Sequence, residues 1–102
     1  MATIPEALDF LAQAYQLRRQ GKLADALPLC QRAVALCPDH AEAYGDLGLT
    51  LGALGRLNEA AASFQRALAL KPEIPELHYH LGLALLKLGN PAGAAADRKS
   101  VV

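Results

Sequence analysis

Histidine and cysteine are the residues of this 102-residue chain with the most metal-binding chemistry, and there are only three and two of them. Cys37 and His40 flank Pro38 at a spacing that would let both contact one ion. Two ligands do not complete a tetrahedral zinc site. His78 and His80 are two residues apart on an expected helix, so they point in different directions and do not chelate together. We therefore expect no metal site.

The sequence also lacks the common catalytic motifs. Four glycines between residues 45 and 55 follow no expected strand and precede no Lys-Ser or Lys-Thr pair, which argues against a phosphate-binding loop. There is no Gly-x-Ser-x-Gly motif, and acidic pairs such as Asp39 and Glu42 are typical of helix surfaces. We expect no catalytic residue, no cofactor and no enzymatic activity in this segment.

Charge and composition narrow the class of partner. Ten Lys and Arg balance ten Asp and Glu, so no overall field favours nucleic acid or an anionic membrane as a partner. The chain is 53% hydrophobic but only 5% aromatic, which favours closely packed helices over strands. No apolar run is long enough to span a bilayer, and the N-terminus does not resemble a secretory signal. We expect a cytoplasmic protein.

A 34-residue period runs through the chain. Gly21, Gly55 and Gly89 are each 34 residues apart, and so are Pro38 and Pro72. The segment at 31–38, QRAVALCP, recurs at 65–72 as QRALALKP. A period of this length indicates stacked supersecondary units rather than one irregular domain.

Each repeat is expected to contain two helices, because apolar residues recur at helical spacing on either side of a glycine. The expected helices span residues 6–19, 24–36, 41–54, 58–70, 75–88 and 92 to about 100. Asp39 and Asn58 lie where helices should start, and Pro75 suits a first turn. The prediction is an all-α single domain, 1–102, with repeats at about 7–40, 41–74 and 75–102.

The second repeat carries a family pattern in full. Its members are Tyr44, Leu47, Gly48, Leu51, Gly55, Ala60, Phe64, Ala67 and Pro72. In this pattern the sequence resembles the tetratricopeptide repeat (TPR) family. The first repeat has Cys30 in place of the aromatic residue, and the third departs from the pattern after Ala94. The resemblance implies three helix-turn-helix units in a right-handed superhelical solenoid, the third atypical or truncated, with a concave groove.

The resemblance also implies which residues face a ligand. Transferred by repeat register, the partner-binding residues are Leu11, Tyr15, Arg18, Asp46, Leu49, Gly52, Tyr79, His80, Leu83 and Lys87. The alternative is that these side chains are ordinary surface, since much of any protein surface is apolar. Gly45, Gly52 and Ala53 should leave a shallow apolar pocket. His78 takes the slot of Phe10 and Tyr44, which predicts a partly buried histidine.

Three functions remain open at this point. The first is an interaction module that binds a partly apolar peptide or amphipathic helix, so the expected partner is a protein or peptide. The second is a regulatory or substrate-presenting segment of a larger enzyme, such as a glycosyltransferase-like protein. The third is a self-assembly module. Two well-known ligand modes of the family, a carboxylate clamp and an asparagine ladder, are disfavoured because the matching slots include Leu11, Asp46, Glu76 and His80.

The third repeat has an unusual end. Arg98 falls in the slot that Cys30 and Phe64 occupy, and no proline closes the last expected helix. Repeat arrays normally end in a capping helix with a polar outer face. We therefore expect the terminal pair either to fray after about Asp97 or to form a homo-oligomer through this uncapped repeat.

Overall fold

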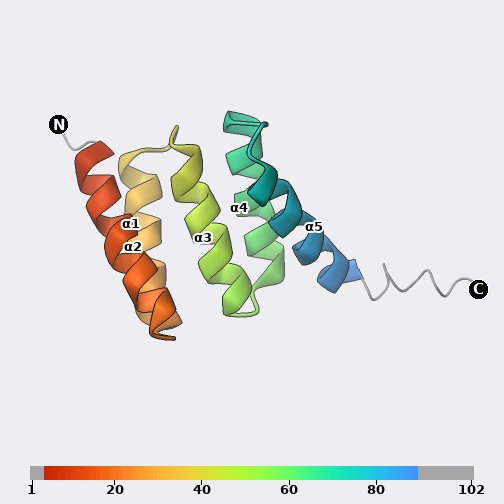
Figure 1. Cartoon of the computed structure of the whole chain (residues 1–102), viewed down its shortest axis with the longest axis horizontal. Helices are drawn as coiled ribbons and strands as arrows, with labels where there is room; N and C mark the ends of the chain where they lie inside the picture. The colour runs from red at the N-terminus through yellow and green to blue at the C-terminus, as the bar shows by residue number, and fades with distance from the viewer. Residues whose placement is uncertain (1–3, 90–102) are drawn as a thin grey trace, which may run out of the picture.

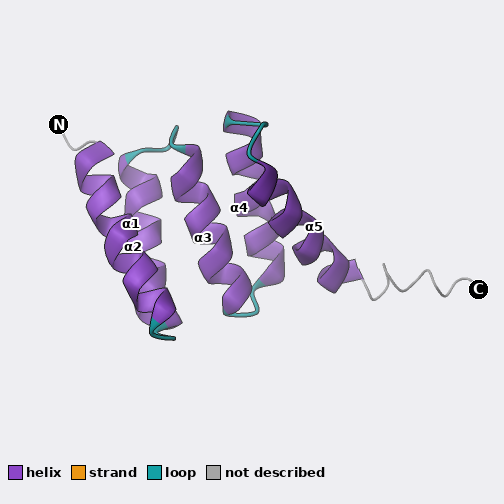
Figure 2. Cartoon of the chain, in the orientation of Figure 1, coloured by secondary structure: helices purple, strands orange, loops and turns teal. Residues whose placement is uncertain are grey.

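The structure is a computed structural model that describes residues 4–89, and this part of the chain is built from helices joined by short loops (Figure 2). The helices are α1 (Ile4–Arg19), α2 (Leu23–Leu36), α3 (Ala41–Ala53), α4 (Leu57–Leu70) and α5 (Pro75–Gly89). Their ends lie within two residues of those expected from the sequence, which confirms the all-α repeat. The sixth expected helix and the tail after Asp97 lie outside the described residues.

The helices form two layers. Helices α1, α3 and α5 make the layer nearer the viewer in Figure 1, and α2 and α4 make the layer behind it. Each helix packs against the next along the chain, and the contacts between α1 and α3 and between α3 and α5 are much smaller. This arrangement is a short solenoid, in which each unit buries its apolar face against its neighbour.

Glycines end the first helix of the first two repeats. Gly21 and Gly55 have φ of 80° and 85°, a region that side chains with a Cβ rarely adopt. In the first turn the Lys22 N–H donates to the Leu17 carbonyl at 2.8 Å, and the Gly21 N–H donates to Arg18 at 3.0 Å. The same pair of bonds follows 34 residues later, so both turns are Schellman motifs.

The helix starts differ from the sequence expectation. The N-caps of α3 and α4 are His40 and Arg56, and neither makes a side-chain capping bond. Asp39 precedes the cap, and Asn58 is already the second residue of α4. The reason lies in the turn, because the Arg56 N–H closes the Schellman motif and α4 begins directly after it. Pro75 is the first residue of α5, as predicted.

Small residues bring the paired helices close together. The first core cluster contains Ala7, Leu11, Ala14, Ala26, Cys30, Ala33 and Ala43, and the second contains Ala41, Leu51, Ala60, Phe64, Ala67 and Leu77. Leu47 packs against both clusters, so the core is continuous. Burial raises the pKa of the Cys30 thiol, which keeps it protonated as a small apolar side chain.

The tightest approach is between α3 and α4. A Cβ at Gly48 would lie 2.6 Å from Cε1 of Phe64, so the ring lies directly against the backbone of α3. A Cβ at Gly52, one turn later, would meet only the Cβ of Ala60 at 3.8 Å, an ordinary contact. The packing of α3 against α4 therefore leaves no room for a side chain at Gly48, whereas it leaves room for a methyl group at Gly52.

This difference predicts opposite effects of the same substitution. Gly52→Ala should raise the free energy of unfolding by about 0.5–1 kcal/mol, because alanine loses less backbone entropy on folding. Gly48→Ala should lower it by about 1–3 kcal/mol, since the Phe64 ring must move. Urea denaturation of both variants measures the difference. Equal effects at the two positions would contradict the close packing described here.

Candidate functional site: the groove between α3 and α5

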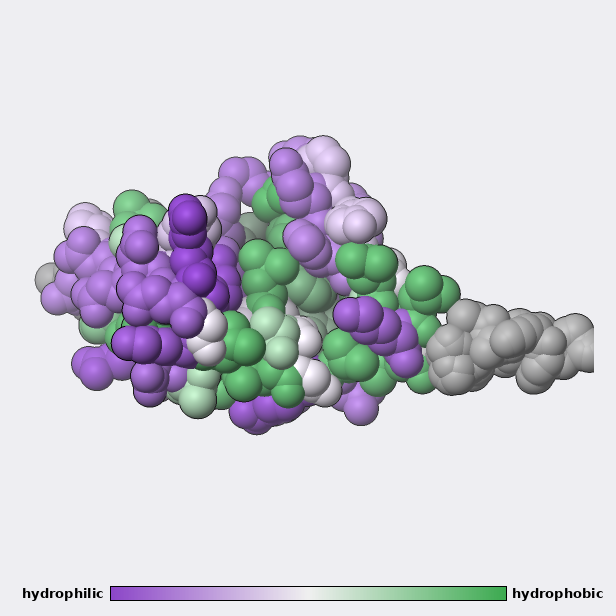
Figure 3. Space-filling view, turned by 60° about the horizontal axis from the view of Figure 1, so that its bottom comes forward, coloured by the Kyte–Doolittle hydropathy of each residue, from purple (hydrophilic) through white to green (hydrophobic). Residues whose placement is uncertain are grey.

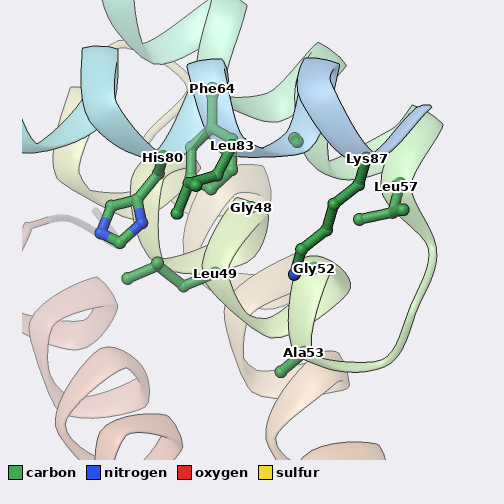
Figure 4. A pocket seen from close by; sticks show the side chains of 10 residues that line it. Gly48, Leu49, Gly52, Ala53, Leu57, Phe64, His80, Leu83 and Lys87 are labelled. Carbon is green, nitrogen blue, oxygen red and sulfur yellow. The ribbon is translucent and has the colours of Figure 1, made fainter. Parts of the chain in front are cut away.

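A hollow of about 190 Å³ lies between the second and third repeats (Figure 4). It is lined by Gly48, Leu49, Gly52, Ala53, Leu57, Phe64, His80, Leu83, Ala84 and Lys87. Helices α3 and α5 supply its two walls, and Phe64 and Leu57 of α4 also line it. The lining is largely apolar, and its polar side chains are those of His80 and Lys87.

A second hollow of about 280 Å³ adjoins the first. Its lining residues are Glu42, Gly45, Asp46, Leu49, Ile74, Glu76, Leu77 and His80. Leu49 and His80 line both hollows, so the two lie side by side along the groove between α3 and α5. The groove is acidic near the start of α3 and of α5, and its apolar end lies near Lys87.

The sequence placed five of the hollow's residues in the binding site. Leu49, Gly52, His80, Leu83 and Lys87 come together at the first hollow, although they lie on two helices. In Figure 4 the Lys87 side chain extends from α5 toward α3 and ends near Gly52. Of the expected low-bulk pocket, Gly52 and Ala53 line this hollow together with Leu83, whereas Gly45 lines only the second hollow and Tyr15 lines neither.

Two predicted site residues with aromatic rings lie outside the hollow. The Tyr79 side chain is 64% exposed, and its ring meets His80 edge-on with centroids 5.5 Å apart. The Tyr15 side chain is 48% exposed, and the guanidinium groups of Arg18 and Arg19 lie 5.7 and 5.8 Å from its ring. Both tyrosines are accessible to a partner.

The structure corrects the assignment of Leu11. Its side chain is only 6% exposed and belongs to the first core cluster, together with Ala7, Ala14 and Ala43. Leu11 is therefore a core residue and is not available to a ligand. Its register counterpart Tyr79 is exposed.

Arg18 and Asp46 form a polar cluster between the first two repeats. Nη2 of Arg18 lies 3.8 Å from Oδ1 of Asp46, and the two side chains are 15% and 30% exposed. Beside them the Thr50 hydroxyl donates to the Asp46 carbonyl at 3.0 Å and lies 3.5 Å from the Cys30 thiol. Among the described residues Nη1 of Arg18 has no hydrogen-bond partner, although it is buried. These two residues are thus engaged with each other.

The pKa values of two carboxyl groups in the groove are shifted in opposite directions. Burial raises the pKa of Asp46, and the Arg18 guanidinium only partly opposes this. Glu42 has a lowered pKa, chiefly because its own backbone N–H bonds the carboxylate, with a smaller contribution from Lys71 at 3.4 Å. The first group is easier to protonate than usual, and the second is harder.

Sequence reasoning missed several groove residues and misplaced one histidine. Phe64, Leu57 and Ala84 line the hollow, but the sequence pattern marks Phe64 only as a core aromatic residue. His78 is exposed rather than partly buried, and its Nε2 lies 2.7 Å from the Pro72 carbonyl. The equivalent residues Phe10 and Tyr44 are covered by the guanidinium groups of Arg32 and Arg66, respectively. In the third repeat the position equivalent to these arginines is Ser100, which lies outside the described residues.

The surface distribution agrees with this description of the site. Figure 3 shows hydrophilic residues concentrated over the N-terminal end of the molecule and hydrophobic residues gathered in the middle and toward α5. Contiguous apolar surface of this kind marks binding sites more often than scattered apolar residues do.

None of the helices within residues 4–89 is long and apolar enough to cross a membrane.

The two layers of paired helices and the groove along one of them define a helical-repeat scaffold. A family model described as tetratricopeptide repeat matches residues 5–50, and one described as TPR repeat matches residues 53–89. The chain belongs to the tetratricopeptide repeat family. The sequence-based recognition of the family is confirmed.

The solved structures that are similar to this chain include the following two. The first TPR of Spaghetti (RPAP3), bound to the HSP90 peptide SRMEEVD, is 30% identical with a TM-score of 0.79. The match covers 81% of this chain and 66% of that one. A mutant O-GlcNAc transferase of Thermobaculum terrenum is 33% identical with a TM-score of 0.75, covering 80% of this chain and 16% of that one. No curated protein sequence matches the chain.

The opposite pKa shifts predict opposite pH dependence. For Asp46, the folded form binds its proton more tightly than the unfolded form. Wild type should therefore lose stability relative to Asp46→Asn as the pH rises from 3.8 through the raised folded pKa. For Glu42, wild type should be more stable than Glu42→Gln above pH 4.5 and lose that advantage as the pH falls through the lowered folded pKa.

Melting curves of wild type and both variants between pH 3 and 7 measure these slopes. Asp46→Asn also removes the ionic partner of Arg18, so the constant offset between the curves is not diagnostic, whereas their slope is. Parallel curves for wild type and Asp46→Asn would show that the Asp46 carboxyl group is not buried in the folded protein.

Proposed function

We propose that this chain is a protein-interaction module that binds a partly apolar peptide or an amphipathic helix in the groove between α3 and α5. The observation that carries the proposal is the meeting of Leu49, Gly52 and Leu83 around a hollow of about 190 Å³. An apolar surface of this kind is costly to leave in water, and burying one side chain there would recover that free energy.

The exposed rings extend the binding surface beyond the hollow. Tyr79 lies on α5 and Tyr15 on α1, so a peptide that crosses α3 would contact both. Large aromatic side chains that are already exposed supply much contact area with few rotatable bonds. In this proposal the binding surface consists of Tyr15, Leu49, Gly52, Tyr79, His80, Leu83 and Lys87. The paired side chains of Arg18 and Asp46 form its N-terminal margin.

The similar structures support a peptide partner in general terms. The RPAP3 domain binds a peptide of HSP90, and the O-GlcNAc transferase is an enzyme of which this chain spans only a small part. A regulatory or substrate-presenting role within a larger enzyme is the alternative form of the same proposal. We further propose that the chain works in the cytoplasm, without nucleic acid or membrane as a partner.

A random dodecapeptide library displayed on phage tests the proposal. Peptides should be enriched on the wild-type protein, and Tyr79→Glu should weaken the best of them at least tenfold. This residue is 64% exposed, so its substitution should leave the fold intact. The matched control is Leu70→Glu on α4, a 37% exposed position that lines neither hollow. No enrichment on wild type, or equal loss with the control, would contradict the groove assignment.

A second candidate function, self-assembly, is favoured by the outer face of α5. The Leu85 side chain is 47% exposed, whereas Leu51, its counterpart 34 residues earlier, is 4% exposed. We propose that this face contacts a second copy of the chain. The alternative fates of the C-terminal tail, fraying or exchange, lie outside the described residues.

Dilution distinguishes an oligomer from a monomer. Light scattering over a hundredfold range of concentration should show a larger species that dissociates on dilution, and Leu85→Lys should shift the dissociation to higher concentration. The groove substitution Tyr79→Glu is the control and should have no effect. A monomer at every concentration would contradict self-assembly without affecting the peptide-binding proposal.

A further inference from the structure

The first two repeats offer a direct comparison with the groove, because equivalent residues are 34 positions apart. Arg18 corresponds to Gly52, and both lie near the end of the first helix of their repeat. Three groups surround the Arg18 side chain: the Tyr15 ring, the Cys30 thiol and the Asp46 carboxylate. Their counterparts are Leu49, Phe64 and His80, and all three line the first hollow.

At the junction between the first and second repeats, this space is therefore filled by a side chain of the protein itself. The Arg18 side chain is 15% exposed, so its aliphatic stem and guanidinium are largely enclosed by α1, α2 and α3. Its charge faces Asp46 at 3.8 Å. At the second junction Gly52 supplies no side chain, and the equivalent space remains as the hollow of about 190 Å³. An apolar cavity of roughly 150 Å³ holds a benzene molecule, so this hollow has room for one aromatic or branched side chain.

The charge of the residues around this space also differs between the first junction and the second. At the first, the acidic residue Asp46 receives the arginine. At the second, His80 takes that position and stacks on Phe64, with ring centroids 5.8 Å apart. Lys87 lies at the mouth, and none of the residues lining this hollow is acidic. Within residues 4–89 Lys87 has no ion pair.

We propose that the hollow is the anchor site for one uncharged apolar side chain of a partner peptide, phenylalanine, leucine or methionine, with an acidic residue beside it that pairs with Lys87. The proposal deepens the peptide-binding function and rests on it. A lysine or arginine anchor is disfavoured on charge, because its ammonium or guanidinium group would lie beside Lys87 and none of the residues that line this hollow is acidic. Selectivity arises from Gly52 leaving the site open and from His80 and Lys87 setting its charge.

The test recreates the filling of the first junction at the second. In Gly52→Arg with His80→Asp, the new pair copies Arg18 and Asp46 and should close the hollow. Gly52→Leu closes it without adding charge and serves as a second variant. Leu70→Glu is the control, because this 37% exposed position on α4 lines neither hollow. Circular dichroism and melting temperature check that each variant is folded.

The probes are the best library peptide and two synthetic copies that differ only in the residue beside the anchor, glutamate or lysine. Fluorescence anisotropy should give at least tenfold weaker binding to Gly52→Leu and to the double variant, and unchanged binding to Leu70→Glu. The glutamate copy should bind wild type at least fivefold more tightly than the lysine copy, and Lys87→Gln should abolish that preference.

Each other outcome counts against a specific claim. Library peptides that bind wild type and Gly52→Leu equally would overturn the anchor site while leaving the groove function in place. Enriched peptides with arginine or lysine at the anchor, or a preference for the lysine copy, would overturn the charge assignment. A wild-type protein that enriches no peptide would overturn both the anchor site and the function on which it rests.

Discussion

The contact between the Phe64 ring and the backbone of Gly48 sets the geometry of the second repeat. With no Cβ at Gly48, helices α3 and α4 approach until the ring lies against the main chain, and the flanking alanines of the core allow the same closeness along their length. Interiors are packed to crystal-like density, so a ring held this tightly fixes both helix positions.

This contact also links stability to the first hollow. Phe64 belongs to the second core cluster, and it also lines the hollow and stacks on His80. The back of the hollow is therefore part of the core, and its shape does not depend on the flexible side chains of the surface. In the proposed function, a preformed site of this kind reduces the conformational entropy that the protein itself loses on binding a peptide.

The first two repeats share the same backbone arrangement and differ in the side chains at the junctions. At the first junction a cysteine, an arginine and an aspartate fill the space that a phenylalanine, a glycine and a histidine leave open at the second. The Schellman turns at Gly21 and Gly55 hold the register constant, so substitution at one position changes the chemistry of one junction without moving the next. Repeat proteins tolerate such variation because each unit contacts only its neighbours.

The sequence by itself determined the period, the helices and the family, because glycine, proline and small apolar residues recur at intervals that only stacked helix pairs satisfy. It also determined that Leu49, Gly52, His80, Leu83 and Lys87 share one face. The tertiary structure alone decided that Leu11 is buried while Tyr79 is exposed, since this depends on whether a following helix covers the position. It likewise decided that Arg18 fills one junction and that Phe64 lines the other. The repeat register predicts which face of its helix a residue lies on. Whether that residue is buried or exposed depends on side chains from helices that are distant in the sequence.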